Sequence, residues 1–132
     1  MDLSQRHETI DLLLDLKHDL GKYLRLPLAW LPDHASNDDV RSALSKALFT
    51  TRTNADGSFK TAATIWCEFK AESTPLTGHA GWHQMQNAVE RALKWETTMA
   101  TEEIIDRDRA KLELSNVYDV ISTLIEEVKN GR

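Results

Sequence analysis

The chain has 132 residues, of which 41% are hydrophobic and 28% are charged, and this is the composition of one globular domain spanning residues 1–132. The formal net charge of -5 excludes a general attraction to nucleic acids or anionic membranes, because both bind basic surfaces. The sequence has a single cysteine, Cys67, no apolar leader and no long apolar run. We therefore expect a cytoplasmic protein that binds neither nucleic acid nor membrane.

Helical periodicity runs through the whole sequence, and strand signals are nearly absent. The first predicted helix begins near Ser4 and ends or kinks at Pro27, because the proline ring clashes with the carbonyl group four residues back. The apolar face predicted for this helix consists of Ile10, Leu13, Leu16, Leu20, Tyr23 and Leu24. Residues 28–32 are expected to form an apolar turn that closes the end of the bundle.

Two helices are predicted in the middle of the chain. Ser36 and Asp39 form a capping box at the start of the second helix, which is expected to end near Thr51. Residues 54–57, with the sequence Asn-Ala-Asp-Gly, predict a turn. Ser58 would then cap a shorter third helix.

The last third of the chain predicts a fourth and a fifth helix. The fourth helix should bury Met85, Val89, Ala92, Leu93 and Met99. The fifth helix should begin near Thr101, where Glu102 and Glu103 suit the positive end of the helix dipole. Ile104, Ile105 and Leu112 project to a different side from the later apolar stripe, and this shift of the apolar face predicts a helix break or two packing partners.

Together these segments predict an all-α fold, an up-down bundle of four main helices plus a shorter one. The apolar stripes of the segments should meet in a single core. The predicted core residues are Leu13, Leu20, Leu24, Leu44, Ile65, Val89, Val117, Ile121 and Leu124.

Residues 17–24, with the sequence Lys-His-Asp-Leu-Gly-Lys-Tyr-Leu, are the stretch with the clearest chemical meaning. His18 lies about 160° from the leucine stripe on a helical wheel, so its imidazole should face solvent. A neutral imidazole nitrogen is a competent nucleophile at pH 7. Lys22 would offset the charge of a transferred phosphoryl group, and Gly21 would keep the approach clear of a side chain. This pattern predicts a phosphoryl acceptor.

The run from His18 to Lys22 resembles the phosphoacceptor helix of histidine-containing phosphotransfer domains. In that family a leucine, a lysine and a glycine closely follow the histidine on a four-helix bundle, whereas here the glycine precedes the lysine. The resemblance implies that His18 accepts the phosphoryl group, with Lys22 as the supporting cation and Gly21 as the small residue. It also implies a response-regulator receiver domain as the partner, which supplies the catalysis, and no bound cofactor or metal.

The same run is similar to two other patterns. In the phosphoacceptor box of sensor kinases, an acidic and an apolar residue likewise follow the histidine. In HD-type metal phosphohydrolases, a His-Asp doublet binds a divalent metal, which would make His18 and Asp19 ligands. His7 lies three turns back on the same predicted helix, and Asp119 lies opposite the apolar stripe of its own helix, so neither is expected to complete such a site.

A non-catalytic helical interaction protein remains an alternative, with a homodimer formed through the terminal helices. His79 and His83 would share one helical face at a spacing that zinc sites use, but two ligands make no site, so a polar surface is expected. Trp66 fits the core by its period. The tryptophans expected to be half-buried at the bundle ends, or to anchor a partner, are Trp30, Trp82 and Trp95.

Overall fold

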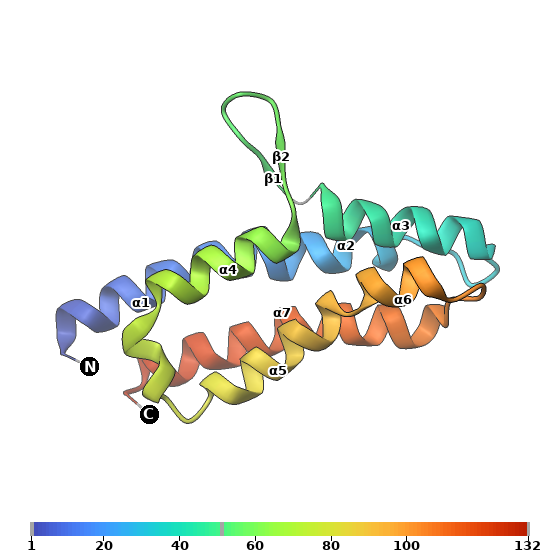
Figure 1. The fold of residues 1–132 in the computed structure, drawn as a ribbon. Coiled ribbons are helices and arrows are strands. Elements are labelled where there is room, and N and C mark those ends of the chain that lie inside the picture. The colour runs from blue at the N-terminus through green and yellow to red at the C-terminus, as the bar shows by residue number, and fades with distance from the viewer. Residues whose placement is uncertain (1, 51, 132) are drawn as a thin grey trace.

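The computed structural model describes residues 2–50 and 52–131 and is predominantly helical (Figure 1). The elements follow one another in this order: α1 (Leu3–Leu16), the π-helical segment η1 (Lys17–Lys22), α2 (Tyr23–Ala29), α3 (Asn37–Phe49), β1 (Arg52–Thr53), β2 (Phe59–Lys60), α4 (Ala62–Glu72), the 3₁₀-helix η2 (Thr74–Gly78), α5 (Trp82–Leu93), α6 (Trp95–Thr101) and α7 (Arg107–Lys129). The predicted all-α fold class is confirmed, with one short hairpin added to it. Among the described residues, every helix is too short or too polar to cross a bilayer.

The C-terminal helix α7 organises the packing. It lies against α5, α2, η1 and α1, while α3 packs on α2 and α6 (Figure 1). The buried apolar side chains form one cluster, and all nine residues of the predicted core belong to it. The apolar stripes of the sequence therefore identify the core correctly.

The first helical stretch widens into a π-helix where its core leucines are spaced four residues apart. Leu16, Leu20, Leu24 and Leu28 are all buried. In a regular α-helix each four-residue step would rotate the side chain by about 40° away from a single line. The wider turn of η1 opposes that rotation, since its hydrogen bonds span five residues instead of four. The π-helical segment thus keeps one leucine row on the core side.

The end of this stretch differs from the prediction at three points. The helix continues past Pro27 and ends at Ala29. Tyr23 is 37% exposed instead of buried, because η1 shifts the helical register just before it. Trp30 is 81% exposed, so it does not help to close the end of the bundle, although Leu28 is buried in the core.

The second helix begins at the predicted capping box. Ser36 Oγ accepts the backbone N–H of Asp39 at 3.1 Å, and the Asp39 carboxylate accepts the backbone N–H of Ser36 at 3.3 Å. The helix, α3, ends at Phe49, while the predicted end, Thr51, lies outside the described residues. The start of this helix is therefore confirmed.

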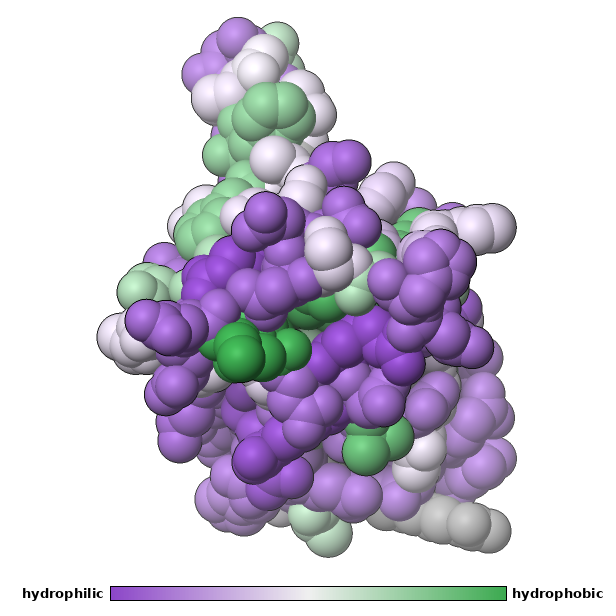
Figure 2. Space-filling model, turned by 90° about the vertical axis from the view of Figure 1, so that its right-hand side faces the viewer, coloured by the Kyte–Doolittle hydropathy of each residue, from purple (hydrophilic) through white to green (hydrophobic). Residues whose placement is uncertain are grey.

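A short β-hairpin precedes α4, and the sequence did not predict it. β1 and β2 have two residues each and pair antiparallel, with Thr53 opposite Phe59. The predicted turn at residues 54–57 connects them, and Gly57 has a φ of 87°, a conformation that glycine adopts without strain. The hairpin projects from the bundle (Figure 1), and part of its surface is hydrophobic (Figure 2).

The hairpin also moves the start of the next helix. Ser58 lies in the turn and does not cap a helix, contrary to the prediction. Thr61 caps α4 instead, because its hydroxyl accepts the backbone N–H of Thr64 at 3.2 Å. The hairpin turn at residues 54–57 and the start of α4 are therefore separated by strand β2.

The hairpin turn should respond to pH through Asp56. The Ser58 hydroxyl and backbone N–H donate to the Asp56 carboxylate at 2.6 and 3.0 Å, and they lower the pKa of this carboxyl. These bonds stabilise the turn above the unfolded pKa and are lost as the pH falls through the lower folded pKa. We expect Ser58→Ala to raise the pKa of Asp56 in an NMR titration. Ser42→Ala, a change in an exposed serine on α3, should leave it unaltered, and an unchanged pKa in Ser58→Ala would contradict the assignment.

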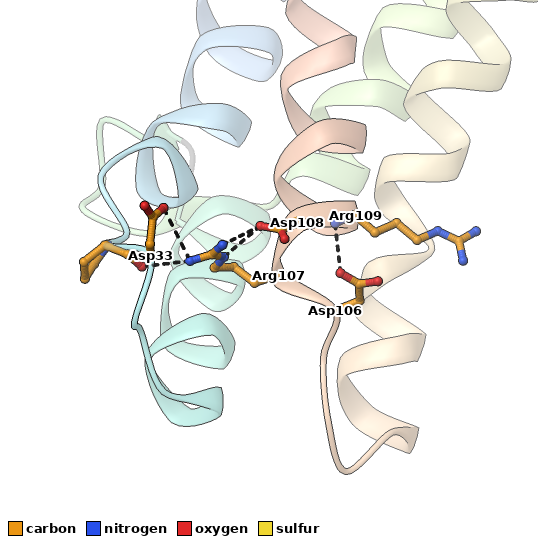
Figure 3. Close-up of polar contacts among 6 residues, drawn as sticks. Asp33, Asp106, Arg107, Asp108 and Arg109 are labelled. Carbon is orange, nitrogen blue, oxygen red and sulfur yellow. Dashed lines mark hydrogen bonds and ion pairs between the residues drawn. The ribbon is translucent and has the colours of Figure 1, made fainter.

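The last helix begins later than the sequence predicts. α7 starts at Arg107 instead of near Thr101, and Asp106 caps it by accepting a backbone N–H of its first turn at 3.1 Å (Figure 3). Glu102 and Glu103 therefore lie in the connection from α6 and not in a helical turn. This connection is a helix break, one of the two outcomes that the shift of the apolar face predicts, and it contains Ile104 and Ile105, whereas Leu112 lies exposed on the unbroken α7.

Arg107, at the start of α7, binds the loop between α2 and α3 through a hydrogen bond and an ion pair (Figure 3). Its guanidinium group donates to the Pro32 carbonyl at 3.1 Å and lies 3.7 Å from the Asp33 carboxylate. It also binds Asp108 at 2.5 Å, and the hydrogen bond with Asp108 raises the pKa of Arg107, with the charges of Asp108 and Asp33 acting in the same direction. The loop that follows Trp30 is therefore held in place by α7.

Candidate functional site

His18 lies on η1, the π-helical segment of the first helical stretch. Its side chain is 57% exposed, which confirms the prediction that the imidazole faces solvent. Leu20, two residues later, is fully buried, so η1 presents one face to the core and the other to solvent. π-helical turns inside α-helices frequently occur at functional sites. In this chain the π-helical segment contains the run from His18 to Lys22 that was singled out in the sequence.

Asp19 orients the imidazole of His18. Its Oδ1 lies 3.2 Å from Nδ1 of His18, and its own side chain is 15% exposed. A carboxylate beside Nδ1 favours the tautomer with the proton on that nitrogen. The Nε2 atom then carries the lone pair, and within the part of the chain that the structure describes it has no hydrogen-bond partner. In this tautomer Nε2 is the ring nitrogen whose lone pair is available to a partner.

Tyr23 contacts the same imidazole from a second direction. The two ring centroids are 5.3 Å apart, and the ring planes stand at 87° to each other. Edge-to-face geometry of this kind is favourable for aromatic rings. Helical periodicity places Tyr23 in the core, and the His-Asp doublet suggests Asp19 only as a metal ligand, so neither contact was predicted. The one available signal is the adjacency of histidine and aspartate in the chain.

The two lysines of η1 have different surroundings. Lys17 Nζ lies 4.9 Å from the centre of the Tyr118 ring, and the guanidinium group of Arg25 lies 3.9 Å from it. Lys22 is exposed, four residues after His18. Lys22 is therefore the lysine of this segment that can meet an incoming anion.

Gly21 is buried, and its position supports a role in packing. A Cβ atom built on Gly21 would lie only 3.1 Å from the Cα atom of Tyr118 on α7. The missing side chain lets η1 and α7 approach each other closely. This position differs from the expectation that Gly21 clears the approach to His18, because the glycine faces another helix and not solvent.

A cleft of about 220 Å³ lies beside the His18–Asp19 pair, between α4 and the first helical stretch. Asp19 lines it together with the carboxylates of Asp15, Glu68 and Glu72, and Lys60 binds Glu68 at 2.7 Å. Carboxylates repel a phosphoryl group through Coulomb forces. The electrostatics of the site therefore favour an anion on the side of Lys22 over one in this cleft.

The ligand set that the HD-type resemblance requires is not assembled in the described residues. His7 and Asp119 are exposed on α1 and α7, and no group of three or more histidine, cysteine, aspartate or glutamate residues there could hold a metal ion. The prediction that His79 and His83 share one helical face is wrong, because α5 begins only at Trp82. His79 instead accepts the backbone N–H of Gly81 through Nδ1 at 3.0 Å.

Three of the four tryptophans are buried in the core, whereas the fourth tryptophan and the cysteine are exposed. Trp66 is buried as predicted and stacks on Phe69 and Trp82, with 5.8 Å between the ring centroids in each pair. Trp82 and Trp95 are also buried, which differs from the half-buried positions expected at the bundle ends. Trp30 and Cys67 are exposed. Among the tryptophans, only Trp30 can meet a partner.

Comparison of the chain with models of protein families, with curated proteins and with solved structures found no match. The geometry around His18 is therefore the guide to function in this chain. That geometry consists of an exposed imidazole, a carboxylate at Nδ1 and an exposed lysine on the same segment.

Proposed function

We propose that this chain is a cytoplasmic phosphotransfer module of the up-down helical type, in which His18 accepts and relays a phosphoryl group. The proposed partner is a response-regulator receiver domain that carries a phosphoaspartate. The observation that carries the proposal is the exposed His18 imidazole whose Nδ1 lies 3.2 Å from Asp19 Oδ1. An oriented and accessible nucleophile is what such a reaction needs from the accepting protein.

The transfer step assigns one role to each residue. The Nε2 lone pair of His18 attacks phosphorus, a P–N bond forms, and the P–O bond to the partner's aspartyl oxygen breaks, which returns that aspartate to its carboxylate form. The imidazole ring becomes positively charged, and Asp19 stabilises that charge through the Nδ1 proton. Lys22 offsets the negative charge of the phosphoryl group during transfer.

The proposal predicts one acid-labile phosphoryl group per chain. A phosphorylated imidazole is labile in acid and stable in alkali, so the wild type, incubated with an acyl phosphate or with a panel of phosphorylated receiver domains, should gain one group that acid removes. His18→Gln should gain none and keep its helical content, because exposed positions contribute little to stability. Lys22→Ala should slow the transfer about tenfold. Mass spectrometry and circular dichroism provide the two readouts.

The chain offers a matched control in His7, which is an exposed histidine on α1. His7→Gln should be labelled as fast as the wild type. A wild type that stays unlabelled across the whole panel, or a His18→Gln variant that is labelled normally, would rule out the acceptor role. A non-catalytic helical interaction protein would then be the remaining function.

A further inference from the structure

The helices α2 and α3 leave an apolar surface uncovered. Two adjoining hollows of about 490 and 420 Å³ lie along them and share Leu26, Pro27 and Lys46 in their linings. Trp30 and Phe59 border these hollows and are 81% and 58% exposed. We call this region the α2–α3 surface, and its apolar residues are Tyr23, Leu26, Pro27, Trp30, Leu31 and Phe59. Exposed aromatic residues around an apolar hollow are typical of protein interfaces.

The α3 side of this surface carries one acid and one base on the same helical face. Asp39, Ser42 and Lys46 are exposed at positions i, i+3 and i+7 and line the larger hollow. Asp39 and Lys46 are separated by about 10 Å along the helix axis, and Ser42 lies between them. Ser42 and the neighbouring Ala43 are small, so a second helix can approach closely at this point.

We propose that the α2–α3 surface is the interface of a homodimer whose two-fold axis passes beside Ser42 and Ala43. A two-fold interface must be complementary to itself. With two copies of α3 antiparallel across this axis, Asp39 of each copy faces Lys46 of the other, so one surface supplies both halves of two ion pairs. The apolar hollows and the two Trp30 side chains meet around these pairs. This interface differs from the terminal helices, which would form the dimer contact in the alternative function considered from the sequence.

The backbone that follows Trp30 is held in place before any partner arrives. The loop after it is fastened by Arg107, which binds the Pro32 carbonyl and Asp33 (Figure 3). A group that is already ordered loses less conformational entropy on association. Trp30 is therefore presented from a backbone that is already ordered, and the proposal does not depend on the chemistry of His18.

Sedimentation velocity over a range of concentrations tests this proposal. The wild type should show a monomer–dimer equilibrium, and Trp30→Ala should raise the dimer dissociation constant at least about tenfold. Leu112→Ala is the matched control, because Leu112 is a 71% exposed leucine on α7, outside the α2–α3 surface. It should leave the dissociation constant unchanged. A wild type that is monomeric at every concentration, or a dimer that Trp30→Ala and Leu112→Ala affect equally, would overturn the proposal.

Charge exchange tests the two-fold geometry itself. Lys46→Asp places two acids opposite each other in the homodimer, and Asp39→Lys places two bases opposite each other, so each variant alone should be mainly monomeric. An equimolar mixture should form a heterodimer, because every pair across the axis is again one acid and one base. Circular dichroism would check that Asp39→Lys, which removes one bond of the α3 capping box, stays folded. A mixture that stays monomeric while both variants are folded would exclude this arrangement.

Discussion

Replacement of Leu20 by alanine is expected to lower the free energy of unfolding by about 2–5 kcal/mol. Leu20 is fully buried on η1, and η1 contacts α1, α2, α4 and α7, so the lost side chain leaves a cavity where these elements meet. The cost has two parts, because apolar atoms lose their burial and the rigid surroundings cannot fill the space. Denaturant unfolding followed by circular dichroism measures the change.

The control for this experiment is Leu112→Ala on the outer face of α7. Leu112 is 71% exposed, so its truncation should change the free energy of unfolding by no more than about 0.5 kcal/mol. A loss below about 1 kcal/mol for Leu20→Ala would mean that η1 is not packed as described. The solvent-facing position of His18 on the opposite side of η1 would then lose its support.

Replacement of Gly21 by leucine is expected to destabilise the protein by about 3 kcal/mol. Two effects oppose each other. Glycine in a helix costs about 1 kcal/mol relative to alanine, and leucine, a good helix former, would recover most of this. The steric effect is larger here, since even the first carbon of a side chain would lie 3.1 Å from the backbone of Tyr118. A backbone atom cannot move aside as a flexible side chain can, so η1 and α7 would have to separate.

Gly78→Leu provides the comparison for Gly21→Leu. A Cβ atom on Gly78 would meet no atom within 4 Å, so this variant should unfold at nearly the same denaturant concentration as the wild type. If Gly21→Leu were as stable as Gly78→Leu, the close contact between η1 and α7 would be refuted. The cation–π contacts of Tyr118 with Arg25 and Lys17 should weaken in the Gly21 variant as well.

The core of this fold could be predicted from sequence because burial follows apolar periodicity. Leu13, Val89 and Ile121 belong to stripes long enough to define a helical face, and all three are buried. The capping box of Ser36 and Asp39 was predictable for a different reason, since both partners lie within one helical turn. Local signals of this kind do not depend on the rest of the fold.

The features that the sequence did not predict arise where the backbone departs from a regular α-helix, which a helical wheel assumes throughout. A wheel with a constant rotation per residue loses its phase at η1, so Tyr23 is assigned to the wrong face. The two-residue strands β1 and β2 are too short to show any alternation, and only the turn at Gly57 leaves a recognisable pattern.

In the candidate site, too, a feature set by position along the helix could be predicted, whereas features set by contacts between side chains or with other helices could not. The exposure of His18 follows from its position relative to the leucine stripe, and the structure confirms it. The packing role of Gly21 could not be predicted, because its partner Tyr118 lies near the other end of the chain. The contact between Asp19 and His18 depends on the side-chain conformations of two adjacent residues, which no sequence pattern specifies.

The distribution of the four tryptophans has a spectroscopic consequence. Trp66, Trp82 and Trp95 are 2–6% exposed, whereas Trp30 is 81% exposed. Indole fluorescence shifts to longer wavelengths in water, and a dissolved collisional quencher reaches only the rings that solvent reaches. The emission of this chain therefore separates into a sheltered component, which follows the integrity of the core, and an accessible component from Trp30, which follows the covering of the α2–α3 surface.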